Sequence, residues 1–144
     1  MGSEVIKIAN CSGYYGDRLS AAKEMVEGGP IDVLTGDYLA ELTMTILFNQ
    51  KLKRGDDKGY VGTFLKQLKD VAKTCKEKEI KIVTNAGGLN PKSMANEIQI
   101  ILSELGLEMQ VAYIDGDDLM SRMSDLQNSC LLYTSDAADE GWWV

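Results

Sequence analysis

A strand that runs directly into a glycine turn and a proline-initiated helix is the feature that most constrains the fold of this chain. The stretch extends from Ile80 to Pro91, IKIVTNAGGLNP, and begins as an apolar run interrupted only by Lys81. It becomes small and polar at Thr84, and a helical pattern begins at Pro91 and is expected to end at Gly106. Proline suits the first position of a helix because the amide hydrogen that it lacks would have no helical partner there. The stretch therefore predicts half of a βαβ unit, with a loop able to approach a ligand closely.

Strand and helix patterns alternate along the rest of the chain. Besides residues 80–83, strands are predicted over residues 4–9, 31–34 and 109–114. Asp17 is the expected N-cap of the first helix, the second helix ends in a basic loop over residues 51–59, and the third carries a continuous apolar stripe from Val61 to Cys75. Short apolar strands that alternate with helices are typical of a parallel sheet covered on each side. The predicted fold class is α/β, a doubly wound, mostly parallel sheet with helices on both faces.

Composition excludes several classes of function. The net charge of −7 argues against nonspecific binding to nucleic acid or to an anionic membrane surface. No apolar run reaches the roughly 20 residues of a membrane helix, and the first residues lack a signal-peptide layout, so a cytoplasmic location is expected. Three cysteines without metal-type spacing fit a reducing compartment. Since the chain has no histidine, it cannot supply a Ser-His or Cys-His catalytic pair or a histidine metal site. No residue is predicted to bind a metal, and no motif identifies a cofactor.

The last 16 residues differ from the rest. From Ser129 the sequence SCLLYTSDAADEGWWV has neither a helical nor a strand period. Its segment LLYTSDAADE resembles the translated read-through of a sequencing adapter, so it is left out of the arguments on fold and function. We expect one α/β domain over residues 4–128 and a non-native, disordered tail over residues 129–144.

Four predicted strands end in polar loops, NCSGYYGD, TGDY, TNAGGLN and DGDD. Ligands of open α/β sheets bind outside the carboxyl ends of the strands. Each loop alone is explained as a turn, because Gly, Asn and Asp are turn residues, but the four together favour a binding edge. The ligand-binding candidates are Asn10, Ser12, Gly13, Arg18, Gly36, Asn85, Gly87, Gly88, Asn90 and Asp115.

The glycine loop after Ile80–Val83 could cradle a phosphate, because glycines let backbone amides approach it at a helix N-terminus. The loop is not G-x-G-x-x-G and lacks the lysine of a P-loop, so its nucleotide signal is weak. Two interpretations of Asn85 and Asn90 stay open, as hydrogen-bonding arms or as residues that tolerate left-handed turns.

Asp37, Asp17 and Cys11 are the catalytic candidates. A carboxylate at Asp37 could act as a general base, and the alternative makes it, like Asp117, a helix N-cap. Cys11 would be a nucleophile if a helix N-terminus lowered the pKa of its thiol, whereas a buried structural cysteine is the favoured alternative. Arg18, next to Asp17, could hold a carboxylate or phosphate, and a solvated surface arginine is the alternative.

The segments ANCSGYYGDRLSAAKEMVEGGPIDVLTGDYLAELTM and IKIVTNAGGLNP, with GDDL near Asp117, resemble the N-terminal domain of the acyclic terpene utilisation family over about residues 4–126. The resemblance implies a Rossmann-like domain, a cytoplasmic location and a link to the degradation of branched acyl-CoA compounds. It implies that the chain corresponds to the opening portion of longer members, and it transfers no reaction.

The expected function is therefore to act on or bind a CoA-linked or anionic small molecule in terpenoid catabolism, and the alternative is a non-catalytic ligand-binding or accessory subunit of a catabolic complex. Partners expected beside the small molecule are a second copy of the chain or a catabolic partner subunit.

Overall fold

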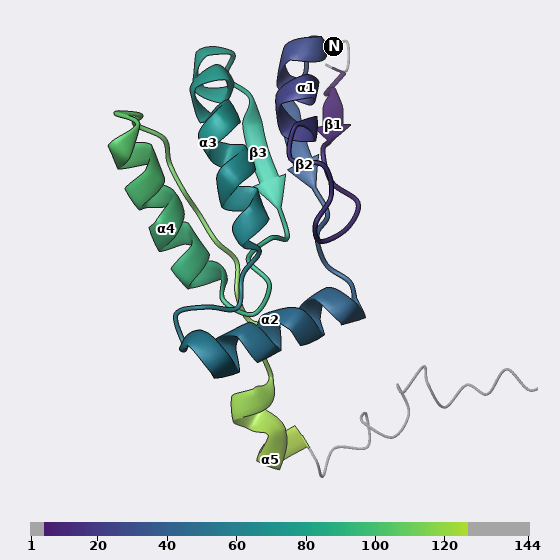
Figure 1. Ribbon diagram of the computed structural model, residues 1–144, viewed down its shortest axis with the longest axis vertical. Coiled ribbons are helices and arrows are strands. Elements are labelled where there is room, and N and C mark those ends of the chain that lie inside the picture. The colour runs from purple at the N-terminus through teal and green to yellow at the C-terminus, as the bar shows by residue number, and fades with distance from the viewer. Residues whose placement is uncertain (1–4, 127–144) are drawn as a thin grey trace, which may run out of the picture. The chain divides into compact units, whose positions relative to one another are not determined.

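The computed structural model describes residues 5–126, and the chain divides into two compact units, Met1–Ile114 and Asp115–Val144. The predicted tail over residues 129–144 lies outside the described residues. In the first unit the elements follow in the order β1 (Ile8–Asn10), α1 (Ala21–Gly28), β2 (Val33–Gly36), α2 (Glu41–Arg54), α3 (Gly62–Glu77), β3 (Lys81–Thr84) and α4 (Pro91–Glu104) (Figure 1). The second unit contains the short helices η1 (Met120–Arg122) and α5 (Met123–Leu126). The predicted α/β class is confirmed.

The sheet is parallel, with β2 between β1 and β3. Ile8 pairs with Val33, and Val33 pairs with Lys81, so both crossovers step in the same direction across the sheet. Right-handed crossovers that step in one direction place their helices on the same face. Accordingly α1 packs against α3, and α3 packs against α4 (Figure 1).

The core lies between that face and the helices. Leu34 of β2 belongs to a buried cluster with Val26 of α1 and Val71 of α3, and Ile82 of β3 packs against the same cluster. The apolar stripe of α3 is buried as its spacing predicts, and Cys75, with no exposed surface, is part of it. A second cluster joins α2, α3 and α4 around Leu47, Phe64 and Leu102. The burial of these two clusters holds the helices on the sheet, because removal of apolar surface from water is the main favourable term in folding.

The opposite face of the sheet carries apolar side chains that no part of residues 5–126 covers, so they are exposed to solvent. Ile8 is 64% exposed and Val83 is 60% exposed, whereas Leu34 on the covered face is 2% exposed. Side chains alternate between the faces of a strand, so Val33 and Lys81 lie on the same face as Ile8 and Val83. The second helical layer of a doubly wound sheet would cover these residues.

Helix α2 lies across the end of the sheet at which the strands finish (Figure 1). Leu47, on its buried side, has no exposed surface and belongs to the cluster around Phe64. The predicted end of this helix at Lys51 was wrong: α2 continues to Arg54, because Lys, Leu and Arg are all good helix formers. The amide of Gly55 closes the last turn by donating to the carbonyl of Lys51.

The predicted strand over residues 109–114 was wrong. This segment forms no strand in the described part of the chain, although Leu107, Met109 and Val111 pack against the core cluster of α3 and α4. Alternate residues of this segment are therefore partly buried against the core. No backbone ladder to β3 accompanies this burial among the described residues, and a strand requires that ladder.

Two predictions about helix ends are settled by the caps. Asp17 does not cap α1, whose first residue is Ala21 and whose N-cap position is occupied by Ser20. Gly106 does end α4, with a left-handed φ of 67° that glycine adopts without a Cβ penalty.

Among the helices of residues 5–126, none has the length and apolar content to span a membrane.

Candidate functional site

Three polar loops meet at the carboxyl edge of the sheet, after β1, β2 and β3. The parallel register places Asn10 beside Thr35 and Gly36 beside Thr84, so the residues that follow each strand start from one edge. The first two loops are joined by the amide of Asp37, which donates to the carbonyl of Ser12 at 3.0 Å. The structure thus brings together three of the four loops expected at this edge.

Asp37 and Asn85 form the centre of this edge. The side-chain amide of Asn85 donates to the Asp37 carboxylate at 2.6 Å, and its oxygen accepts from the amide of Tyr38 at 2.9 Å. Asp37 is not a helix cap, because Ala40 occupies the N-cap position of α2. Both Asp37 and Asn85 are exposed, so a carboxylate and an amide face solvent in contact with each other.

The loop after β1 is held by its own side chains. Asn10 donates from its amide to the carbonyl of Ser12 at 2.9 Å, and the Ser12 hydroxyl, which is buried, donates to the carbonyl of Tyr14 at 3.1 Å. The carboxylate of Asp17 accepts from the amide of Gly13 at 3.0 Å and from the amide of Arg18 at 2.7 Å. These two backbone hydrogen bonds hold the pKa of Asp17 below its ordinary value.

Arg18 has a partner within the domain. Its guanidinium lies 2.8 Å from the carboxylate of Glu24, and both side chains are largely exposed. Exposed ion pairs of this kind contribute only about 0–1 kcal/mol, so the interaction with Glu24 holds the arginine loosely.

Two glycines of the loop after β3 are required by packing. A Cβ on Gly87 would approach the Cβ of Pro91 to 2.8 Å, and a Cβ on Gly88 would clash with the Cδ1 of Leu47. At the end of β2, a Cβ on Gly36 would meet the ring of Tyr38 at 2.6 Å. The glycines therefore admit neighbouring parts of the protein, which leaves the phosphate-cradle interpretation without structural support.

Both asparagines of this loop act as hydrogen-bonding arms. Asn90 caps α4 by accepting from the amide of Ser93 at 3.2 Å, and Pro91 occupies the first helical position as predicted. The Asn90 amide also donates to the carbonyl of Asp56 at 2.8 Å. The left-handed alternative is wrong, since Glu79 is the non-glycine residue with a positive φ in the part of the chain that the structure describes.

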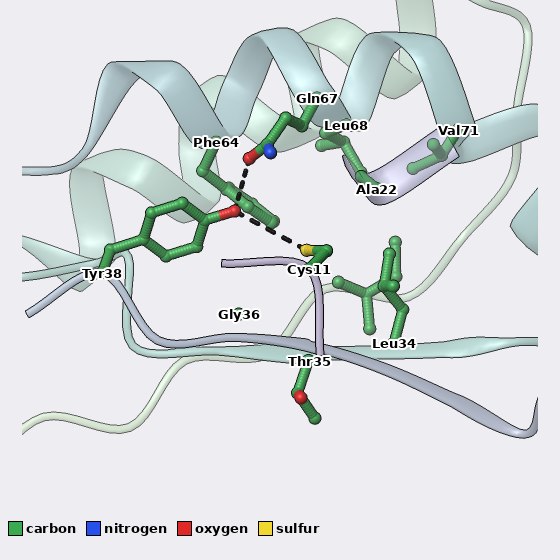
Figure 2. A pocket seen from close by; sticks show the side chains of 11 residues that line it. Cys11, Ala22, Leu34, Thr35, Gly36, Tyr38, Phe64, Gln67, Leu68 and Val71 are labelled. Atoms are coloured by element: carbon green, nitrogen blue, oxygen red, sulfur yellow. Dashed lines mark hydrogen bonds between the residues drawn. The ribbon is translucent and has the colours of Figure 1, made fainter. Parts of the chain in front are cut away.

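Cys11 lies in the core behind the loops, 6% exposed. Figure 2 shows its sulfur beside the hydroxyl of Tyr38, at 3.9 Å, with Gln67 on the other side of that hydroxyl. The cavity that these three residues line has a volume of about 10 Å³, room for roughly one water molecule. Burial raises the pKa of the Cys11 thiol and also that of the Tyr38 hydroxyl, so both groups keep their protons at neutral pH.

We expect the thiols of Cys11 and Cys75 to react slowly in the folded protein. Burial raises the pKa of Cys75 to about 11, and only the thiolate is nucleophilic. Alkylation by iodoacetamide at pH 8, followed by peptide mass spectrometry, should be about 100-fold slower at both residues in buffer than in urea. Rapid modification of Cys11 in buffer would contradict its burial and would favour its role as a catalytic nucleophile.

Gln67 is a residue of this region that the sequence did not predict, and Tyr38 was predicted only as part of the TGDY loop. Tyr38 is 1% exposed, and its hydroxyl donates to the side-chain oxygen of Gln67, which is 2% exposed. The sequence carried one signal for Gln67, which is polar yet stands three residues after Phe64 and four before Val71 on the apolar side of α3.

The fourth predicted loop belongs to the second unit, which begins at Asp115. Within that unit the carboxylate of Asp118, not that of Asp117, accepts from the amide of Met120, at 3.0 Å.

Among residues 5–126 no group of three or more Cys, Asp or Glu side chains is placed to hold a metal ion.

Comparison with known proteins supplies one match. A family model described as "Acyclic terpene utilisation family protein AtuA" matches residues 6–141. No curated protein and no solved structure matches the chain.

Proposed function

The chain belongs to the acyclic terpene utilisation family, and on that premise we propose that its α/β domain binds a CoA-linked or otherwise anionic small molecule in cytoplasmic terpenoid catabolism. The place proposed for the ligand is the carboxyl edge of the sheet, between the loops after β1, β2 and β3. Membership supports the terpene context, and the general preference of open α/β sheets for ligands at this edge supports the location.

The observation that carries the proposal is the contact between Asp37 and Asn85. Loops from two neighbouring strands bring an exposed carboxylate and an exposed amide to 2.6 Å, and the Asp37 amide ties them to the first loop. Asp37 is our candidate for proton transfer, because its carboxylate is the acidic group at the centre of the edge. Asn85 would orient it.

An anionic ligand is supported by the loop after β1. The amides of Gly13 and Arg18 already hold one carboxylate, that of Asp17. The Arg18 guanidinium next to it is engaged only by an exposed partner, Glu24, which a ligand phosphate or carboxylate could replace at small cost. Arg18 is thus the positive group that we propose for an anionic ligand at this loop.

The second candidate function is a non-catalytic ligand-binding or accessory subunit. It is favoured by the absence of histidine from the chain and by the protonated, buried state of Cys11, which leave Asp37 and Asp17 as the acid–base candidates. Such a subunit would bind the same ligand at the same edge and would require a partner for the reaction.

Replacement of Asp37 by asparagine distinguishes the two functions. We expect Asp37→Asn to bind CoA and branched acyl-CoA esters within about threefold of wild type in calorimetric titration, because the amide oxygen still accepts from Asn85. Conversion of the ester, followed by mass spectrometry, should fall about 100-fold or more, since asparagine cannot accept a proton.

The matched control is Asp70→Asn, an exposed position on α3 away from the three loops, which should change neither quantity. Binding without conversion by the wild-type protein would establish the accessory function instead. Absence of binding by CoA and by its esters would reject both proposals.

A further inference from the structure

Gln67 of α3 links two of the loops at the carboxyl edge from below. Its side-chain oxygen accepts from the hydroxyl of Tyr38, in the loop after β2, and its amide donates to the carbonyl of Arg18, in the loop after β1, at 3.3 Å. Figure 2 shows the Gln67 side chain reaching from its helix to the Tyr38 hydroxyl. One buried side chain therefore bonds to two loops, at residues that lie 20 positions apart in the sequence.

The path continues from Tyr38 to the third loop. The backbone amide of Tyr38 donates to the side chain of Asn85 at 2.9 Å, and Asn85 donates to Asp37 at 2.6 Å. Arg18, Gln67, Tyr38, Asn85 and Asp37 form a continuous set of contacts that includes all three loops. The exposed groups of the edge are thus connected to a buried residue that no ligand at that edge would touch.

Packing alone does not call for glutamine at this position. The neighbours of Gln67 along α3 at spacings of three and four are Phe64 and Val71, and both are buried hydrophobes. Methionine would fill the same volume without a polar group to satisfy, and buried polar groups are costly unless they are hydrogen-bonded. The amide of Gln67 meets that condition only because both loops present partners to it.

We propose that Gln67 is a positioning residue, which fixes the separation of the loops after β1 and β2 and, through Tyr38, the placement of Asn85 and Asp37. The proposal rests on the proposed function for its ligand, but its effect on the loops is a property of the protein alone. A ligand that spans the first loop and Asp37 would bind to a preformed edge, which lowers the ordering cost of binding.

The test is amide hydrogen exchange of two reporter positions in Gln67→Met. The amide of Asp37 bonds to the first loop through Ser12, and the amide at position 38 bonds to the third loop through Asn85. We expect both amides to exchange about tenfold faster than in a control variant of equal unfolding free energy, because the loops open locally once their shared anchor is gone. Leu102→Ala, in the core of α4, is the control, compared at a urea concentration that equalises stability.

Equal exchange of the two reporters in Gln67→Met and in the control would overturn the proposal. If Gln67→Met does not fold, Tyr38→Phe removes the same hydrogen bond from the other side and must accelerate exchange at Asp37 for the proposal to stand. Titration with CoA then addresses the ligand: affinity should fall about tenfold in Gln67→Met and stay unchanged in Leu102→Ala. Absence of CoA binding by the wild-type protein would reject the proposed function, while the exchange result would still decide the role of Gln67.

Discussion

Gly88→Ala should destabilise the domain by about 2–5 kcal/mol, which is a large part of the stability of a typical domain. Gly88 has a φ of 53°, where a side chain costs about 1–2 kcal/mol. The added Cβ would also clash with the Cδ1 of Leu47 and approach the carbonyl oxygen of Gly59 to 2.8 Å, and overpacking of this kind costs about 1–3 kcal/mol more. Urea denaturation followed by circular dichroism measures the change.

Gly106→Ala provides the matched control. Gly106 has a similar φ, 67°, but a Cβ there would meet no atom within 4 Å. The Gly106→Ala variant should therefore lose only the conformational contribution to the unfolding free energy, about 1–2 kcal/mol. Equal losses in the two variants would show that Leu47 and Gly59 move aside freely, and that α2 does not constrain the loop after β3.

Phe64→Ala should destabilise the domain by about 3–5 kcal/mol. Phe64 is 6% exposed and packs edge-to-face against Tyr38, with ring centroids 6.0 Å apart. Its removal leaves a cavity where α3 meets the loop after β2, and it also removes an aromatic pair worth about 0.5–1.5 kcal/mol beyond the buried area. The free energy of unfolding in urea and the near-ultraviolet circular dichroism of the tyrosines should both report the loss.

The chain has one other phenylalanine, which serves as the control for this variant. Phe48 on α2 is 49% exposed, so Phe48→Ala should change the free energy of unfolding by well under about 1 kcal/mol. A loss as large as that of Phe64→Ala would mean that α2 buries its outer side in solution, which the described residues do not show.

The fold was predictable where one physical signal decided the structure. The stripe of α3 follows the helical period over four turns, so its buried face was evident from Val61 to Cys75. Pro91 and Gly106 marked the ends of α4 because each has a conformational reason for its place. The strand over residues 109–114 was predicted wrongly, because a short apolar run looks alike in a strand and in a segment without a strand partner.

The candidate edge was predictable only in outline. Parallel topology places polar strand ends together, so Asn10, Asp37 and Asn85 could be grouped from the sequence. The local partners of Asp17 could not be foreseen, because an aspartate just before a helix is as suited to closing its own loop as to capping the helix. Gln67 was missed because its importance comes from a contact with Tyr38 across 29 residues.

The order of the strands bears on how this protein folds. Thr35 and Asn10 of the first pairing are 25 residues apart, and Asn85 and Asp37 of the second are 48 apart. Because a doubling of loop length adds about 0.6 kcal/mol of closure entropy, the pairing of β3 is the costlier of the two and is expected to come later. The contact between Asp37 and Asn85 requires that second closure, so we expect the carboxyl edge to form late in the folding of the domain.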